Sequence, residues 1–169
     1  MRALLAFRPE IAPALGALTD ELLHAPNSLT HAERELIAAR VSHLNDCTFC
    51  RESHAAIAVC HLGGREELVA AAVADPERAP ISEKLRALLA LAGRVQQGGG
   101  AVGDGDVARA RSEGVTDREI HDTVLIAAAF CMFNRYVDGL AAWTPTDPEM
   151  YRQRARLTAE HGYAAGPPR

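Results

Sequence analysis

Residues that favour β-structure are scarce in this sequence. Aromatic residues make up only 5% of its 169 positions, and no stretch alternates apolar and polar residues over the length of a strand. Hydrophobic residues nevertheless account for 48% of the chain, and alanine and leucine, two strong helix formers, supply most of them. The composition therefore predicts an all-α protein, and the length suits one domain over residues 1–169.

Long basic or apolar runs are also missing. The formal net charge is −4 at pH 7 and the arginines are scattered, so the sequence lacks the basic patch that nucleic-acid binding requires. No apolar run is long enough to cross a membrane, and Arg8, Pro9 and Glu10 interrupt the N-terminal segment too early for a signal peptide. We therefore expect a cytoplasmic protein with no nucleic-acid partner and no membrane partner.

Capping signals and helix breakers divide the chain into about seven or eight helices. Two capping boxes, at 30–33 and 116–119, each mark the start of a long helix, and Pro148 after Asp147 marks the start of the last one. The predicted helices cover residues 9–24, 31–44, 47–62, 66–74, 83–95, 106–112, 117–142 and one from 148, with a loop at 96–105 and a frayed tail at 160–169.

Cysteine occurs only four times, at positions 47, 50, 60 and 131. Without an export signal these residues are not expected to form a disulfide framework, so a close pair indicates redox chemistry or metal binding. The segment LNDCTFCRESH contains such a CxxC pair, Cys47 and Cys50, followed by His54. Three interpretations of this segment are open: a redox pair, part of a metal site, or an accident of composition.

Helical spacing favours the redox pair. Residues at i, i+3 and i+7 share one helical face, so Cys47, Cys50 and His54 would line one stripe at the start of a helix. Free amide groups and the helix dipole favour a thiolate there. His54 could take the thiol proton, and Glu35 on the preceding helix could orient His54 if the two helices form a hairpin.

A metal site and an accident of composition fit the segment less well. A structural zinc site needs a second ligand pair, and Cys60 and His61 lie on the same straight helix, where they cannot complete a tetrahedral cage. Two inert buried cysteines would leave the helix-start position and the histidine spacing without a reason. A thioredoxin fold would require strands around the CxxC, which the pattern lacks. We therefore expect no bound metal and no cofactor.

Together these residues closely resemble a known family signature. The segment ERELIAARVSHLNDCTFCRESH (33–54) is similar to that of the AhpD-like alkylhydroperoxidases in the carboxymuconolactone decarboxylase superfamily: a glutamate, eleven residues, CxxC, three residues and a histidine. Glu35, Cys47, Cys50 and His54 match it position by position. FNRYVDGL (133–140) resembles the peroxidase-related branch, and the resemblance covers about residues 20–142.

The resemblance implies a fold, an assembly and an activity. It implies an AhpD-like helical domain with a central CxxC-bearing helix, assembled as a homo-oligomer (dimer, trimer or hexamer). The activity would be thiol-dependent reduction of organic hydroperoxides or hydrogen peroxide. Cys50 would attack the peroxide and become a sulfenic acid, Cys47 at the more exposed helix start would resolve it as a disulfide, and His54 and Glu35 would relay the proton. An external thiol or lipoyl-type reductant would restore the dithiol.

Three residues, Cys47, Phe49 and Asn134, need separate comment. Helix electrostatics alone would make Cys47, closer to the amide end, the more acidic thiol. Phe49 stands inside the CxxC where the best-studied branch has a histidine, so the auxiliary proton handling attributed to that histidine cannot operate. Asn134, a polar residue in an otherwise apolar helix, is expected to have a structural role.

Two other functions are open: a non-redox lyase acting on a lactone acid, like the founding members of the superfamily, and a thiol–disulfide oxidoreductase without significant peroxidase turnover. The complete set of two cysteines, histidine and glutamate disfavours the lyase, which generally lacks the CxxC.

Overall fold

The computed structural model describes residues 2–163 and shows helices throughout this range. No strand occurs among these residues, which confirms the all-α prediction. Two short 3₁₀ helices, Pro9–Ile11 and Gly99–Ala101, join the longer elements. The α-helices are α1 (Arg2–Phe7), α2 (Ala12–Leu23), α3 (His31–Leu44), α4 (Thr48–His61), α5 (Glu66–Ala74), α6 (Glu83–Gln97), α7 (Asp104–Ser112), α8 (Asp117–Gly139) and α9 (Pro148–His161).

Two segments differ from the prediction. The described residues contain nine α-helices rather than seven or eight, because α1 is a separate six-residue helix too short to produce a periodic pattern. The loop expected at 96–105 is also shorter, since α6 continues to Gln97 and α7 already begins at Asp104. Gly103 precedes α7, and its amide donates to the carboxylate of Asp106 at 2.9 Å, which starts the helix two residues early.

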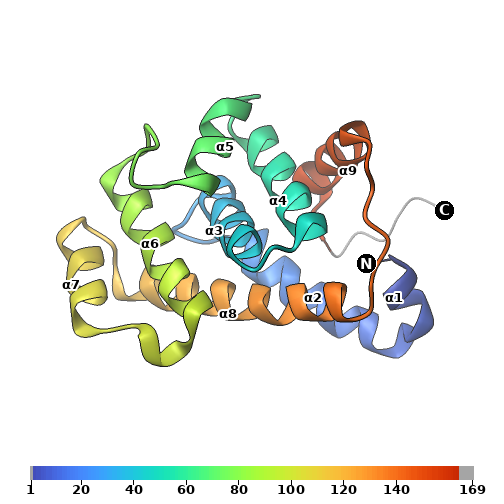
Figure 1. The fold of residues 1–169 in the computed structure, drawn as a ribbon, viewed down its shortest axis with the longest axis horizontal. Helices are drawn as coiled ribbons and strands as arrows, with labels where there is room; N and C mark the ends of the chain where they lie inside the picture. Colours follow the sequence, from blue (N-terminus) through green and yellow to red (C-terminus); the bar gives the residue numbers. More distant parts are fainter. Residues whose placement is uncertain (1, 164–169) are drawn as a thin grey trace.

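Helix α3 lies at the centre of the molecule. It packs against α2, α4, α5, α6 and α8, and most of its residues are buried. Leu36, Ile37 and Val41 contribute to a single large apolar core to which α8 adds Ile126 and Phe130. Figure 1 shows the long α8 running along one edge of the molecule, with α3 and α4 beside it and α9 next to α4. The CxxC helix α4 therefore lies between α3 and α9.

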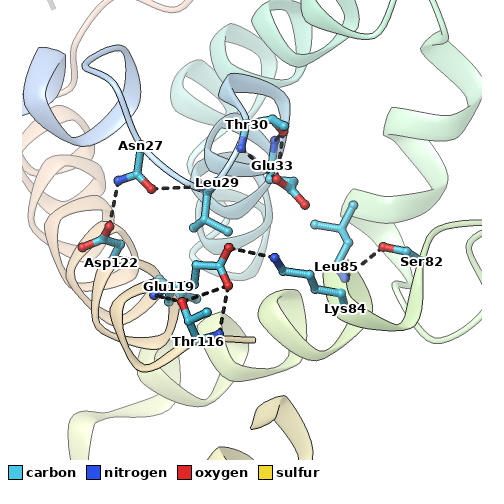
Figure 2. A network of polar contacts seen from close by, with 11 residues as sticks. Asn27, Leu29, Thr30, Glu33, Ser82, Lys84, Leu85, Thr116, Glu119 and Asp122 are labelled. Atoms are coloured by element: carbon cyan, nitrogen blue, oxygen red, sulfur yellow. Dashed lines mark hydrogen bonds and ion pairs between the residues drawn. The ribbon is translucent and has the colours of Figure 1, made fainter. Parts of the chain in front are cut away.

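Both predicted capping boxes form. Thr30 Oγ1 accepts a hydrogen bond from the amide of Glu33 at 3.2 Å, and the Glu33 carboxylate accepts from the amide of Thr30 at 2.8 Å (Figure 2). Thr116 and Glu119 make the same pair of bonds, at 3.2 and 2.9 Å. These bonds satisfy amides that the first turn of a helix leaves without partners. They explain why α3 and α8 begin where the sequence indicates.

Glu119 also joins two helices. Its carboxylate lies 2.7 Å from the ammonium group of Lys84 on α6, although the residue is only 2% exposed (Figure 2). Burial opposes the ionisation of Glu119, but hydrogen bonds from Lys84 and Thr116 outweigh it and lower the pKa of this carboxyl group. A local capping residue thus becomes a bridge between α6 and α8.

The turn between α3 and α4 sets the start of the CxxC helix. Asp46 adopts a left-handed conformation (φ 57°), which Asp tolerates better than most residues, and the amide of Cys47 donates to the carbonyl of Ser42 at 3.0 Å. Cys47, rather than Asn45 or Asp46, is the N-cap of α4. At the other end, Gly63 and Gly64 have φ of 65° and 88°, a left-handed conformation that ends α4 close to the predicted boundary at residue 62.

Candidate active site

The hairpin of α3 and α4 brings the four predicted site residues together in the interior. The exposed fractions of Glu35, Cys47, Cys50 and His54 are 1%, 0%, 3% and 8%. Glu35 faces His54 across the hairpin, and its Oε2 atom lies 2.7 Å from Nδ1 of His54. Because a carboxylate only accepts, Nδ1 carries the proton and donates it, which leaves Nε2 for other partners. The predicted contact between a carboxylate on one helix and an imidazole on the next is present.

Two aromatic rings hold the His54 imidazole. Phe130 on α8 meets it edge-on, with ring centroids 4.5 Å apart and planes at 84°. Tyr163, which follows α9, lies nearly parallel to it, with centroids 6.0 Å apart and planes at 23°. His54 is therefore fixed by apolar packing on two sides and by the Glu35 carboxylate at Nδ1. Such support limits the ring to one orientation, as proton transfer at a defined position requires.

The pKa values of the two thiols are shifted in opposite directions. The thiol of Cys47 donates to the Cys50 sulfur, and this is the largest of the effects that lower the pKa of Cys50 to about 7, against the opposing effect of burial. The positive charge of His54 and a hydrogen bond from Asn134 lower it further. The same donation, together with burial, raises the pKa of Cys47. This order is the opposite of the one that helix electrostatics alone would give, because the hydrogen bond from Cys47 favours the negative charge on Cys50.

Cys47 is also less accessible than expected. As the N-cap it should stand at the exposed start of α4, but the side chain is fully buried and packs with Cys50 and Val137 of α8. The exposed helix start was inferred from α4 alone, and α8 covers it in the folded protein. Asp138, one residue further along α8, lies close to Cys47, and its carboxylate contributes to the raised pKa of this thiol.

Asn134 does more than fill a structural position. Its amide nitrogen lies 3.0 Å from Ser42 Oγ and its amide oxygen accepts from Asn45 at 2.9 Å, so it ties α8 to α3 and to the turn before Cys47. It also donates to Cys50. The available signal was a buried polar residue within an apolar helix, but the sequence does not show which partner it meets.

An apolar cavity of about 1000 Å³ opens beside Cys50 and His54. It lies among α1, α2, α4, α8 and α9, and Phe49 is part of its wall, with a ring centroid 6.3 Å from that of Tyr151. The residue that replaces the family's histidine thus contributes apolar surface to the cavity. The apolar side chains in its wall include Phe49, Ile57, Phe130, Phe133 and Tyr151.

The end of the chain reaches the site, which the sequence did not indicate. A frayed tail was expected over 160–169, but α9 includes Glu160 and His161, and the hydroxyl of Tyr163 donates to Glu35 Oε1 at 2.5 Å. The expectation of fraying is wrong for residues 160–163. Residues 164–169 lie outside the described part of the chain.

The remaining candidate ligands lie apart from this site. Cys131 lies 3.7 Å from the side-chain amide of Asn45, and Cys60 is close to Arg156 on α9. His61 stacks on His31, with centroids 5.0 Å apart. Within residues 2–163, no group of three or more His, Cys, Asp or Glu side chains is arranged to hold a metal ion. In the same range no helix is long and apolar enough to span a lipid bilayer.

The sequence matches one protein family over most of its length. The profile of the carboxymuconolactone decarboxylase family matches residues 9–92 and 69–145. No match is found among curated protein sequences.

Three solved structures are similar in sequence and fold. An uncharacterized peroxidase-related protein from Silicibacter is 30% identical, with a TM-score of 0.78 over 87% of this chain and 75% of that one. Another uncharacterized peroxidase-related protein, described as an alkylhydroperoxidase AhpD core from Ralstonia eutropha, is 27% identical with a TM-score of 0.80 over 90% and 78%. A protein of unknown function from Agrobacterium tumefaciens, described as a candidate AhpD antioxidant defence protein, is 25% identical with a TM-score of 0.71 over 85% and 96%.

Proposed function

The chain belongs to the carboxymuconolactone decarboxylase family, and from this premise we propose that it is an AhpD-type thiol peroxidase acting on organic hydroperoxides. One observation carries the proposal. Cys50, with a thiol pKa of about 7, borders an apolar cavity beside the His54–Glu35 pair. A thiolate that exists at neutral pH is the nucleophile that peroxide reduction requires.

The reaction proceeds in two steps within the protein. The Cys50 thiolate attacks the terminal oxygen of the hydroperoxide, so that an S–O bond forms as the O–O bond breaks. The departing alkoxide takes a proton from His54 and leaves as an alcohol, and Cys50 becomes a sulfenic acid. The Cys47 sulfur then attacks the Cys50 sulfur, an S–S bond forms, and the hydroxide leaves as water with the Cys47 proton.

The cavity supports organic hydroperoxides as the substrate class. Its volume of about 1000 Å³ far exceeds the need of hydrogen peroxide, and its wall next to Cys50 is built of Phe49, Phe130 and Phe133. Burial of an alkyl or aryl group against this wall favours binding by about 25 cal/mol per Å² of apolar surface removed from water. An organic hydroperoxide can use this surface, and hydrogen peroxide cannot.

The cycle needs an external partner. A thiol or lipoyl-type dithiol must reduce the Cys47–Cys50 disulfide by exchange, which returns both thiols and oxidises the donor. We propose the cytoplasm as the site of action because such donors are kept reduced there. We also propose a homo-oligomer, supported by the exposed Leu125 and Met132 on α8 and the exposed Trp143 beyond it. A monomer in analytical ultracentrifugation would contradict this assembly.

Mass spectrometry before and after one equivalent of cumene hydroperoxide tests the proposed function. We expect a Cys47–Cys50 disulfide in the native protein, with cumyl alcohol as the product. Cys50→Ser should lower peroxide reduction by about 1000-fold or more, because the nucleophile is removed. Cys47→Ser should complete one turnover and keep a sulfenic acid on Cys50, which dimedone labels.

Cys131→Ser serves as the matched control, since Cys131 lies outside the site and should leave peroxide reduction unchanged. Peroxide reduction at the native rate by both Cys50→Ser and Cys47→Ser would contradict the proposed function. Disulfide formation with an oxidised dithiol, but not with peroxide, would instead identify a thiol–disulfide oxidoreductase.

A further inference from the structure

The hydroxyl group of Tyr163 lies within hydrogen-bond distance of both members of the Glu35–His54 pair. It donates to Glu35 Oε1 at 2.5 Å, and it lies 3.2 Å from Nδ1 of His54. The other oxygen of Glu35 accepts from His54 at 2.7 Å. Each carboxylate oxygen of this buried residue therefore has its own donor, one from α4 and one from beyond the end of α9.

The turn at the end of α9 fixes the position of Tyr163. Gly162 ends α9 with φ 75°, and its amide donates to the carbonyl of Thr158 at 2.8 Å. The next amide, that of Tyr163, donates to Asp20 Oδ1 on α2 at 2.8 Å. A Cβ atom at position 162 would lie 2.5 Å from Asp20 Oδ1 and 2.9 Å from the His24 ring. Only glycine combines this conformation with so close an approach to α2, so the turn directs the tyrosine inward.

We propose that Tyr163 is a positioning residue of the active site, which holds the Glu35 carboxylate and the His54 imidazole in the arrangement that serves Cys50. This inference rests on the proposed function and adds a residue to it. Tyr163 lies beyond residues 9–145, the part of the chain that matches the family profile. The C-terminal end of α9 thus completes a site whose other members lie on α3 and α4.

The hydroxyl acts on the charge of the pair as well as on its geometry. Burial and the Glu35 carboxylate raise the pKa of Tyr163 well above its ordinary range, so the phenol keeps its proton and remains a donor. A donor to the ionised form of a carboxyl group stabilises that form. An ionised Glu35 in turn supports the positive charge on His54, which favours the Cys50 thiolate.

Loss of the Tyr163 hydroxyl should therefore raise the pKa of Cys50, so that a smaller fraction of this thiol is ionised at neutral pH. Without the hydroxyl, one oxygen of the Glu35 carboxylate loses its donor, so the negative charge that faces His54 is less well stabilised and less well held in place. The ionisable groups around this pair and Cys50 that share these effects are Arg34, Cys47, His61 and Asp138, and they are unchanged by a substitution at 163.

The test is the pH dependence of alkylation of Cys50 by iodoacetamide in the full-length protein, which requires no peroxidase activity. Tyr163→Phe keeps the ring and removes only the hydroxyl. We expect the midpoint of its alkylation profile to move up by about one pH unit, the shift that one hydrogen bond to a charged group can produce. Reduction of cumene hydroperoxide at pH 7 should fall about fivefold, because the thiolate fraction at that pH drops from about one half to about one tenth. Gly162→Val, which displaces the turn, should shift the midpoint in the same direction.

Tyr136→Phe is the matched control, because Tyr136 lies on α8 and does not line the cavity; its profile should coincide with that of the native protein. An unshifted midpoint in Tyr163→Phe would overturn the proposal even if the enzyme reduces peroxide. A shifted midpoint in a protein that does not reduce peroxide would uphold the role of Tyr163 and refute the proposed function.

Discussion

Two buried glutamates show how similar surroundings serve different purposes. Glu119 and Glu35 are 2% and 1% exposed. Each carboxylate has a nitrogen partner at 2.7 Å and a hydroxyl group as a second partner: Lys84 and Thr116 for Glu119, and His54 and Tyr163 for Glu35. By hydrogen bonding alone, the two sites are nearly equivalent.

The difference lies in what the partners can do with a proton. The bond between Lys84 and Glu119 is an ion pair that links α6 to α8 and meets no reactive group. Imidazole is the side chain best suited to general acid–base chemistry, and His54 lies beside a thiol with a pKa of about 7 and a cavity. A buried carboxylate therefore indicates chemistry only when its partner can transfer a proton to a group that a substrate can reach.

The largest expected effect separates the two glutamates by activity. Glu35→Gln removes the negative charge behind His54 and should lower peroxide turnover at pH 7 by about 100-fold, a typical loss for general acid–base support. Glu119→Gln should stay within about twofold of the native rate, since no step of the reaction involves it. Steady-state turnover of cumene hydroperoxide with a dithiol reductant measures both. Equal losses in the two variants would refute the distinction.

A smaller effect concerns stability. Glu119→Gln keeps an acceptor for the Thr116 amide but loses the charge facing Lys84, so the free energy of unfolding at pH 7 should fall by about 1–2 kcal/mol. Urea denaturation measures this loss, and Glu113→Gln, at an exposed position, is the control. Because folding lowers the pKa of Glu119, the advantage of the native protein is complete above the ordinary value of 4.5. It should disappear as the pH falls through the lowered value, and an advantage that persists there would contradict the assignment.

The smallest expected effect is a shift in thiol acidity. Alkylation of the native protein should show one reactive cysteine, Cys50, with a midpoint near pH 7, and Glu119→Gln should leave it unchanged. Cys47→Ala removes the thiol that donates to Cys50, so the midpoint should rise by about one pH unit. Peptide mapping after iodoacetamide treatment at several pH values gives both results. A faster reaction at Cys47 in the native protein would reverse the proposed roles of the two thiols.

Local signals allowed much of the fold to be predicted. The two capping boxes, the glycines at 63 and 64 and the Asp147–Pro148 start all act within a few residues, so the sequence alone indicates where α3, α4, α8 and α9 begin or end. The start of α4 was less clear. Asn45 and Asp46 are the usual kinds of capping residue, but the N-cap is Cys47. The left-handed turn at Asp46 and the packing of Cys47 against Val137 of α8 accompany this start.

The sequence predicted which residues form the candidate site, but not the order of the two thiol pKa values. The spacing of Glu35, Cys47, Cys50 and His54 brings them together wherever α3 and α4 form a hairpin, as they do here. The order of the two thiol pKa values depends on which sulfur holds the proton and on Asn134 and Asp138 from α8. These two residues lie far along the chain from the cysteines, and no local pattern encodes their contacts.

The sequence by itself determined that this protein is helical, where its main helices begin and which thiol pair is the candidate for its chemistry, because propensities, caps and spacing act over a few residues. Only the tertiary structure decided which cysteine is acidic and that Tyr163 joins the site, since it meets Glu35 at a separation of 128 residues. The same applies to the cavity over Cys50, whose wall comes from five different α-helices. Distant groups alter a pKa or enclose a cavity only when folding removes the water between them.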